Sequence, residues 1–145
     1  MPIRLAARAV LIHDGKLLLV NAYPGDASNL WCAPGGGAEM HVGLPENLAR
    51  EVYEETGLNI TVGAPCLVNE FHAPDRGFHQ VEIFFRCTLT SGTLSHDWRD
   101  PEGIVTRRRW FHENELASVR LKPDRLPDVA FSTGIAYDPL ENIVS

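Results

Sequence analysis

Lysine is scarce in this chain. Lys16 and Lys122 are its two lysines, against eleven arginines, and the formal net charge is −6. Proteins that bind nucleic acid non-specifically need a basic surface, so this charge balance excludes a nucleic acid polymer as the expected partner. A small phosphorylated molecule is not excluded, because a bound cation can reverse the local field of an acidic site.

Cysteines and long hydrophobic runs are also few. Cys32, Cys66 and Cys87 are widely spaced and form no Cys-x-x-Cys pair, so neither a zinc site nor a disulfide framework is expected. No apolar run approaches the length needed to cross a membrane. Arg4 and Arg8 interrupt the apolar start of the chain, so we expect no signal peptide and a cytoplasmic location.

The chain has the length of one domain, and we expect a single domain over residues 1–145. Asp14-Gly15 between two apolar runs predicts a β-hairpin. Pro45 suits a first helical turn and Gly57 a helix C-terminus, so a helix is predicted between them. Strands are expected at 6–12, 16–22, 30–33, 59–62, 66–71, 80–89 and 107–111, a short helix at 112–119, and an irregular tail from 122 with one helical turn at 128–131.

This order of elements predicts an α/β protein. Strands precede, surround and follow one central helix, which fits a mixed β-sheet covered by helices. The central helix would dock on the sheet through Ala49, Val52 and Tyr53, which leaves its acidic face toward a cleft.

The stretch 36–58 carries the strongest chemical signal. Glu51, Glu54 and Glu55 are spaced three and four residues apart, so on a helix they share one face and repel one another. A hard divalent cation such as Mg²⁺ prefers carboxylate oxygen and would relieve that repulsion. The glycines at 35–37 lie just upstream, where a backbone without Cβ atoms can approach a ligand closely. Together these features indicate metal-assisted chemistry on a phosphate compound.

These residues resemble the signature of the Nudix hydrolases, the MutT-like pyrophosphohydrolases. Val42 departs from that signature, because it stands where the pattern has its first Glu, and His41 stands where a glycine is usual. In the family that Glu tends to support the arginine of the motif, and Glu46 or Glu39 could replace it. The positions that match are Gly36, Arg50, Glu51, Val52, Glu54, Glu55, Gly57 and Leu58.

The resemblance implies a Nudix-type α/β/α sandwich with a central mixed sheet. It also implies Mg²⁺-dependent hydrolysis, with Mn²⁺ as another usable ion, of a diphosphate bond in a small nucleotide derivative. Glu51 and Glu55 are then the first choice for metal ligands, Glu54 is the next, and the backbone carbonyl of Gly36 joins them.

Catalytic roles beyond the metal ligands are less determined by the pattern. Arg50 is expected to tie the helix to the glycine loop, with a direct catalytic role as the alternative. For the general base we favour Glu102, on a late acidic loop that also holds Asp97 and Asp100, and Glu54 is the competing candidate.

Substrate contacts are expected from the glycine loop, at Gly35, Gly36 and Gly37, and from His41 within it. Nucleotide sugars, ADP-ribose and nucleoside triphosphates all remain open as substrates. Three aromatic residues are candidates to stack on a base, namely Phe71, Phe78 and Trp98.

Another class of function stays open beside the enzyme. A Nudix-fold sensor would bind a nucleotide without hydrolysing it. Val42 keeps this alternative open, because it departs from the signature of the enzymes. The intact carboxylates at 51, 54 and 55 count against it. A homodimer is a further arrangement that the sequence leaves open.

Overall fold

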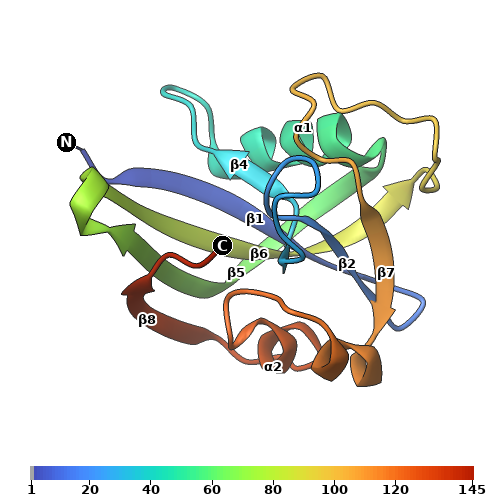
Figure 1. The fold of residues 1–145 in the computed structure, drawn as a ribbon. Helices are drawn as coiled ribbons and strands as arrows, with labels where there is room; N and C mark the ends of the chain where they lie inside the picture. Colours follow the sequence, from blue (N-terminus) through green and yellow to red (C-terminus); the bar gives the residue numbers. More distant parts are fainter. Residues whose placement is uncertain (1) are drawn as a thin grey trace.

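The computed structural model describes residues 2–145. Its centre is one mixed sheet of eight strands, shown as a ribbon in Figure 1. The strands are β1 (Arg4–His13), β2 (Lys16–Asn21), β3 (Trp31–Cys32), β4 (Gly35–Gly37), β5 (Asn59–Ala73), β6 (Phe78–Ser91), β7 (Arg108–His112) and β8 (Ala136–Asn142). The helices are α1 (Leu44–Thr56), α2 (Leu126–Ala130) and the 3₁₀ helices η1 (Pro74–Arg76) and η2 (Glu113–Ser118).

The strand order is β3-β2-β1-β6-β5-β8, with β4 paired to β1 and β7 paired to β2. β1 runs parallel to β6, and β5 runs parallel to β8, while the other pairs are antiparallel. The sheet is therefore mixed, as predicted. Its central strands are covered on both faces, with α1 on one side and α2 on the other (Figure 1).

Alternating side chains build a hydrophobic core on each face of the sheet. On β1, Ala9 and Leu11 pack toward α1, whereas Val10 packs toward α2. From the helices, Leu48 enters the first core and Leu126 the second, each fully buried. Burying a leucine side chain contributes roughly 1.5–3 kcal/mol, so these contacts hold both layers on the sheet.

The predicted hairpin between β1 and β2 is confirmed. Asp14 and Gly15 both have positive φ, at 51° and 75°, and His13 pairs with Lys16. Two positive φ angles are characteristic of the type I′ turn, whose twist matches that of the flanking strands.

The predicted central helix is also confirmed, and its docking face differs from the expected one. Gly57 caps α1 with a φ of 75° and donates its N–H to the carbonyl of Tyr53 at 2.8 Å. Leu48 and Val52 are the buried apolar residues of the helix, whereas Tyr53 is 44% exposed. The Tyr53 ring packs edge-on against Trp98, with centroids 5.2 Å apart, rather than on the sheet.

Three strand predictions need correction. The glycine segment is not a loop, because β4 pairs with Ala6, Ala7 and Arg8 of β1. The two strands expected at 59–62 and 66–71 are one strand, β5, with irregular pairing around Pro65. The tail forms β8, which was expected to be irregular. β8 is an edge strand of the sheet, and there the missing N–H of Pro139 is tolerated.

No helix within residues 2–145 is long and apolar enough to cross a membrane.

Candidate active site

A cavity of about 490 Å³ lies between α1, β4 and the segment that leads into β7. Glu39, Glu51, Glu55 and Glu102 line it, so residues far apart in the sequence meet in one acidic space. The glycine segment, four other strands and the loop before β7 complete its walls, through Arg4, Arg8, Val20, Asn21, Ala22, Cys32, Gly35, Gly36, Gly37, Ala38, Gln80, Ile104 and Val105.

Glu55 is the most perturbed carboxylate of this cavity. Burial raises its pKa to about 8, and the charges of Glu51 and Asp100 act in the same direction. The guanidinium of Arg8 and the N–H of Gly35, which donates to Glu55 Oε1 at 3.1 Å, offset part of that rise. A carboxyl with so high a pKa lacks a sufficient positive partner when no metal is bound.

Glu51 lies against the backbone of Gly36. Its side chain is 13% exposed, and a Cβ atom built on Gly36 would fall 2.8 Å from Glu51 Oε2. A Cβ at position 36 would displace this carboxylate from where it lies. Burial raises the pKa of Glu51, helped by the charges of Glu54 and Glu102, while Arg50 lowers it.

Arg50 joins the helix to the glycine segment, as the sequence suggested. Its guanidinium donates to Glu39 at 2.9 Å and to Glu54 at 3.1 Å. It also donates to Asn47, whose own side-chain amide donates to the carbonyl of Gly37 at 3.0 Å. Glu39 therefore acts as the partner that Val42 cannot supply, and no ion pair described within residues 2–145 joins Arg50 to Glu46.

The loop between β6 and β7 places Glu102 at the cavity. The carboxylate of Asp100 accepts hydrogen bonds from the backbone N–H groups of Glu102, Ile104 and Val105, at 3.1, 3.1 and 2.8 Å. Asp100 is thus committed to holding the loop in shape, while Glu102 lies beside the carboxylates of α1.

Asn21 holds the other end of the same loop, and sequence reasoning missed it. The side chain is 2% exposed, and its Oδ1 accepts the N–H groups of Thr106 and Arg107, both at 2.9 Å. Its amide also donates to the carbonyl of Ile104 at 2.9 Å. An asparagine at the end of an apolar strand was the available signal, since a buried polar side chain must find partners.

An ion pair of Arg8, which lines the cavity, was also missed. Arg8 Nε donates to Glu82 Oε2 at 2.8 Å, and Arg8 Nη1 donates to the carbonyl of Ala33 at 3.1 Å. Burial alone would lower the pKa of Arg8, but the charges of Glu82, Cys32 and Glu55 raise it. Arg8 is therefore a fixed positive charge between the sheet and Glu55.

Some candidates lie apart from this cavity. His41 occupies an exposed turn with a φ of 70° and does not line it. Glu54 is directed to Arg50. Trp98 donates its indole N–H to the carbonyl of Glu54 at 2.8 Å and covers Gly57 at the end of α1, so it is remote from Phe71 and Phe78, which line another cavity.

The carboxylates fit a divalent cation in their chemistry. Glu51 and Glu55 flank the backbone of Gly35 and Gly36, and both have raised pKa values that a cation would reverse. As the side chains of residues 2–145 stand, no three His, Cys, Asp or Glu residues converge on one point at metal-binding distance. A backbone carbonyl, such as that of Gly36, is the remaining kind of oxygen ligand at this position.

Solved structures share this fold. The MutT NUDIX hydrolase from Burkholderia pseudomallei matches with a TM-score of 0.75 and 19% identity, covering 91% of this chain and 100% of that one. A UDP-X diphosphatase matches with a TM-score of 0.72 and 20% identity, covering 95% of this chain and 68% of that one. At these identities the likeness establishes the fold alone.

Sequence comparison establishes the family. The NUDIX domain model matches residues 2–131. Diphosphoinositol polyphosphate phosphohydrolase 2 from Rattus norvegicus is 32% identical over 109 residues, which is 74% of this chain and 55% of that protein. Diphosphoinositol polyphosphate phosphohydrolase 3-alpha from Mus musculus is 33% identical over 109 residues, 74% of this chain and 61% of that protein. This chain spans less than two thirds of these relatives, but the NUDIX domain model matches most of this chain, and the chain belongs to the Nudix hydrolase family.

Proposed function

We propose that this chain is a Mg²⁺-dependent pyrophosphohydrolase that cleaves a diphosphate bond in a small nucleoside diphosphate derivative. The observation that carries the proposal is the packing of two partly buried carboxylates, Glu51 and Glu55, against a glycine backbone in a cavity that also holds Glu102. Without a metal such a cavity would repel a polyanionic substrate.

Glu51 and Glu55 are the side chains that would hold the metal, with the carbonyl of Gly36 beside them and Glu54 as a further ligand. The raised pKa values of Glu51 and Glu55 support this role, because both carboxyls lack a full positive partner. When bound, Mg²⁺ would neutralise the diphosphate charge and lower the pKa of a coordinated water.

Glu102 is the proposed general base. Its carboxylate would accept a proton from the attacking water as the water oxygen bonds to phosphorus and the bridging P–O bond breaks. Both products then carry a phosphate. Arg50 positions the helix by joining Glu39 to Glu54, and Glu54 is the alternative base.

The backbone of Gly35 to Gly37 lines the cavity and would lie along the diphosphate. Arg4 and Arg8 line the same cavity and would face its phosphates. His41 remains a proposed phosphate contact only for a substrate long enough to reach its exposed turn.

A sensor without turnover is the second candidate, and Val42 is the residue that favours it. Val42 has no carboxylate to pair with Arg50, and Glu39 pairs with Arg50 instead, at 2.9 Å. Three intact carboxylates, Glu51, Glu55 and Glu102, share one cavity. These contacts support turnover over sensing.

A single domain over 1–145, a cytoplasmic location and a homodimer complete the proposal. The two buried thiols, Cys66 and Cys87, are free, which suits a reducing compartment. Light scattering of the purified protein tests the homodimer.

The activity is tested by a phosphate-release screen of the purified protein over a nucleotide library, with Mg²⁺, Mn²⁺ or chelator. We expect release from at least one nucleoside diphosphate derivative, lost with chelator and lost in Glu55→Gln. Glu46→Gln is the matched control, because Glu46 is exposed on the first turn of the same helix. Full activity in chelator, or in Glu55→Gln, would exclude the proposed centre.

A further inference from the structure

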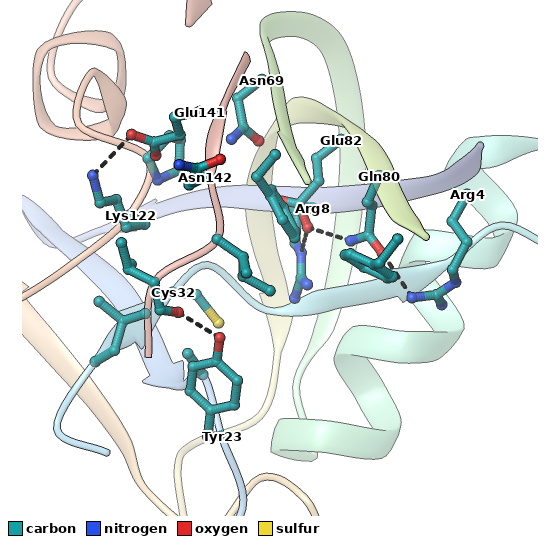
Figure 2. Close-up of a pocket in the computed structure, with 17 residues that line it drawn as sticks. Arg4, Arg8, Tyr23, Cys32, Asn69, Gln80, Glu82, Lys122, Glu141 and Asn142 are labelled. Atoms are coloured by element: carbon teal, nitrogen blue, oxygen red, sulfur yellow. Dashed lines mark hydrogen bonds and ion pairs between the residues drawn. The ribbon is translucent and has the colours of Figure 1, made fainter. Parts of the chain in front are cut away.

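A chain of hydrogen bonds joins four side chains next to the acidic cavity. These side chains line a second cavity of about 270 Å³, which shares Arg4, Arg8 and Gln80 with the acidic one. Arg4 donates to Gln80 at 2.7 Å, and Gln80 in turn donates to Glu82 Oε2 at 2.9 Å. The same carboxylate oxygen accepts the Nε–H of Arg8 at 2.8 Å, as Figure 2 shows. The Glu82 carboxylate is therefore held by two donors.

The parallel pairing of β1 and β6 builds this chain, and burial fixes it. Gln80 lies opposite Arg4, and Glu82 lies opposite Ala6, so these side chains share one face of the sheet with Arg8. Glu82 is 5% exposed and Gln80 is 4% exposed. A buried carboxylate is stable only when it is paired, so Glu82 and Arg8 hold each other in place.

The guanidinium of Arg8 also reaches the backbone that contacts Glu55. Its Nη1 donates to the carbonyl of Ala33 at 3.1 Å and lies 3.5 Å from the carbonyl of Gly35. The N–H of Gly35 donates to Glu55 Oε1 at 3.1 Å. Arg8 and Glu55 thus contact the same short stretch of backbone and line the same cavity, yet no ion pair described within residues 2–145 joins them.

Glu82 competes with Glu55 for this guanidinium. Three groups attract the charge of Arg8, namely Glu82, Cys32 and Glu55. Burial raises the pKa of the Cys32 thiol to about 12, so this thiol is uncharged at neutral pH. Without the charge of Glu82, Glu55 would be the remaining carboxylate in that set, and a buried guanidinium needs one. A carboxylate paired with arginine is a poor metal ligand, because the guanidinium occupies its oxygens and repels a second cation.

We propose that Glu82 is a positioning residue for the metal centre: it binds Arg8 and thereby leaves the Glu55 carboxylate open to a divalent cation. The inference rests on the proposed function, since it takes Glu55 as a metal ligand. Gln80 supports Glu82 by donating to the same oxygen. Glu82, Gln80 and Arg8 all lie outside the stretch 36–58, so they belong to the sheet of this chain and not to the Nudix signature.

Calorimetry of Mn²⁺ binding to the substrate-free protein tests the inference without turnover. Glu82→Gln keeps the shape of the side chain and removes its charge, so Arg8 should pair with Glu55 and weaken Mn²⁺ binding at least about ten-fold. The double variant with Arg8→Gln removes the competing cation as well, so it should recover most of the lost affinity. A residue that only stabilised the sheet would give the opposite order, with the double variant the weaker binder.

Two further measurements keep the inference testable if Glu82→Gln folds poorly or binds Mn²⁺ weakly for another reason. Arg8→Gln alone should bind Mn²⁺ no more weakly than the natural protein, because it removes a charge that repels the ion. A crystal structure of Glu82→Gln without metal should place the Arg8 guanidinium at salt-bridge distance from Glu55. Weaker Mn²⁺ binding in Arg8→Gln, or an Arg8 that stays at the carbonyl of Ala33 in Glu82→Gln, would overturn the inference.

Glu70→Gln is the matched control. Glu70 is a half-buried glutamate of the neighbouring strand β5, and it lines neither cavity. It lies opposite Val81, whereas Glu82 lies opposite Asn69, so Glu70 points to the other face of the sheet. This variant should leave Mn²⁺ affinity unchanged.

Failure of the inference can be told apart from failure of the proposed function. If Glu55→Gln binds Mn²⁺ as tightly as the natural protein, the metal centre is misplaced and the inference fails with it. If Glu55→Gln weakens Mn²⁺ binding while Glu82→Gln does not, the metal centre stands and only the role of Glu82 is refuted.

Discussion

The carboxyl group of Glu55 is largely shielded from water, and it lacks a full cationic partner. This combination is uncommon in folded proteins. Its pKa of about 8 in the metal-free fold exceeds the ordinary value of 4.5. Between these two pH values the folded protein keeps a proton that the unfolded chain has released. The metal-free protein is therefore most stable below pH 4.5 as far as this group is concerned, and it loses that stability as the pH rises toward 8.

Glu55→Gln should remove this pH dependence. The neutral amide cannot ionise, so in chelator the variant should unfold at a higher temperature than the natural protein at pH 8, while near pH 5 the difference should shrink. Thermal unfolding in chelator from pH 5 to 8.5 measures it. The same variant should lose turnover, since it lacks a proposed metal ligand.

Glu46→Gln serves as the control, because Glu46 is exposed on the same helix. A variant at Glu55 whose unfolding temperature followed the natural protein at every pH would show that Glu55 ionises normally in the fold.

At the scale of elements, Glu55 and Asn47 join α1 to β4 directly, and the guanidinium of Arg50 adds a link to the segment that follows β4. Arg50 contacts Glu39, just after β4, and Glu54 of the helix, and its side chain is 41% exposed. Because the pair with Glu39 is exposed, Glu39→Gln should cost about 0.2–1 kcal/mol of unfolding free energy.

Val42→Glu offers a rescue. It restores the carboxylate of the usual Nudix pattern, so it should recover stability in the Glu39→Gln background and add little to the natural chain. Urea unfolding of the two single variants and the double variant measures the coupling. A large loss from Val42→Glu alone would mean that this half-buried position needs an apolar side chain.

Two acidic residues of the loop between β6 and β7 have different roles, because Asp100 holds the loop and Glu102 lines the cavity. Glu102→Gln should lower kcat by roughly a hundredfold, the scale of a lost general base, with metal affinity unchanged. Asp97→Asn, at an exposed position of the same loop, should have little effect and is the matched control. Single-turnover rates and Mn²⁺ binding separate the two quantities.

Asp100→Asn should lower both kcat and stability, because its carboxylate accepts three backbone N–H groups of the loop. If Glu102→Gln stays active while Glu54→Gln is inactive with metal bound, the base lies on α1.

For the whole molecule, local signals predicted most of the fold. The Asp14-Gly15 turn and the Gly57 cap specify their own backbone geometry, and the apolar runs of β1 and β6 mark strands. β8 escaped prediction because it pairs with β5, which is distant in sequence, and such pairing leaves no local pattern around Pro139. Tyr53 was placed on the sheet because an aromatic residue reads as apolar, whereas its partner Trp98 is distant in sequence.

The candidate site divides in the same way. The carboxylates of α1 follow from helical spacing and a family pattern, so sequence could place them together. Asn21, Arg8 and Glu82 carry no motif, and they reach the site through the strand order of the sheet. The sequence also left Glu39 and Glu46 as possible partners of Arg50. Only the path of the backbone shows that Glu39 is the partner.

The indole of Trp98 has a consequence for how this chain tolerates insertions. It fastens the loop to the carbonyl of Glu54, and Asp100 begins the turn that carries Glu102 only two residues later. Residues added before Trp98, at exposed positions 95–97, would lengthen a segment that is tied at its far end, and would leave the reach of Glu102 unchanged. One residue added at Arg99 would move Glu102 relative to α1. The spacing between Trp98 and Asp100 therefore sets the position of Glu102 relative to α1.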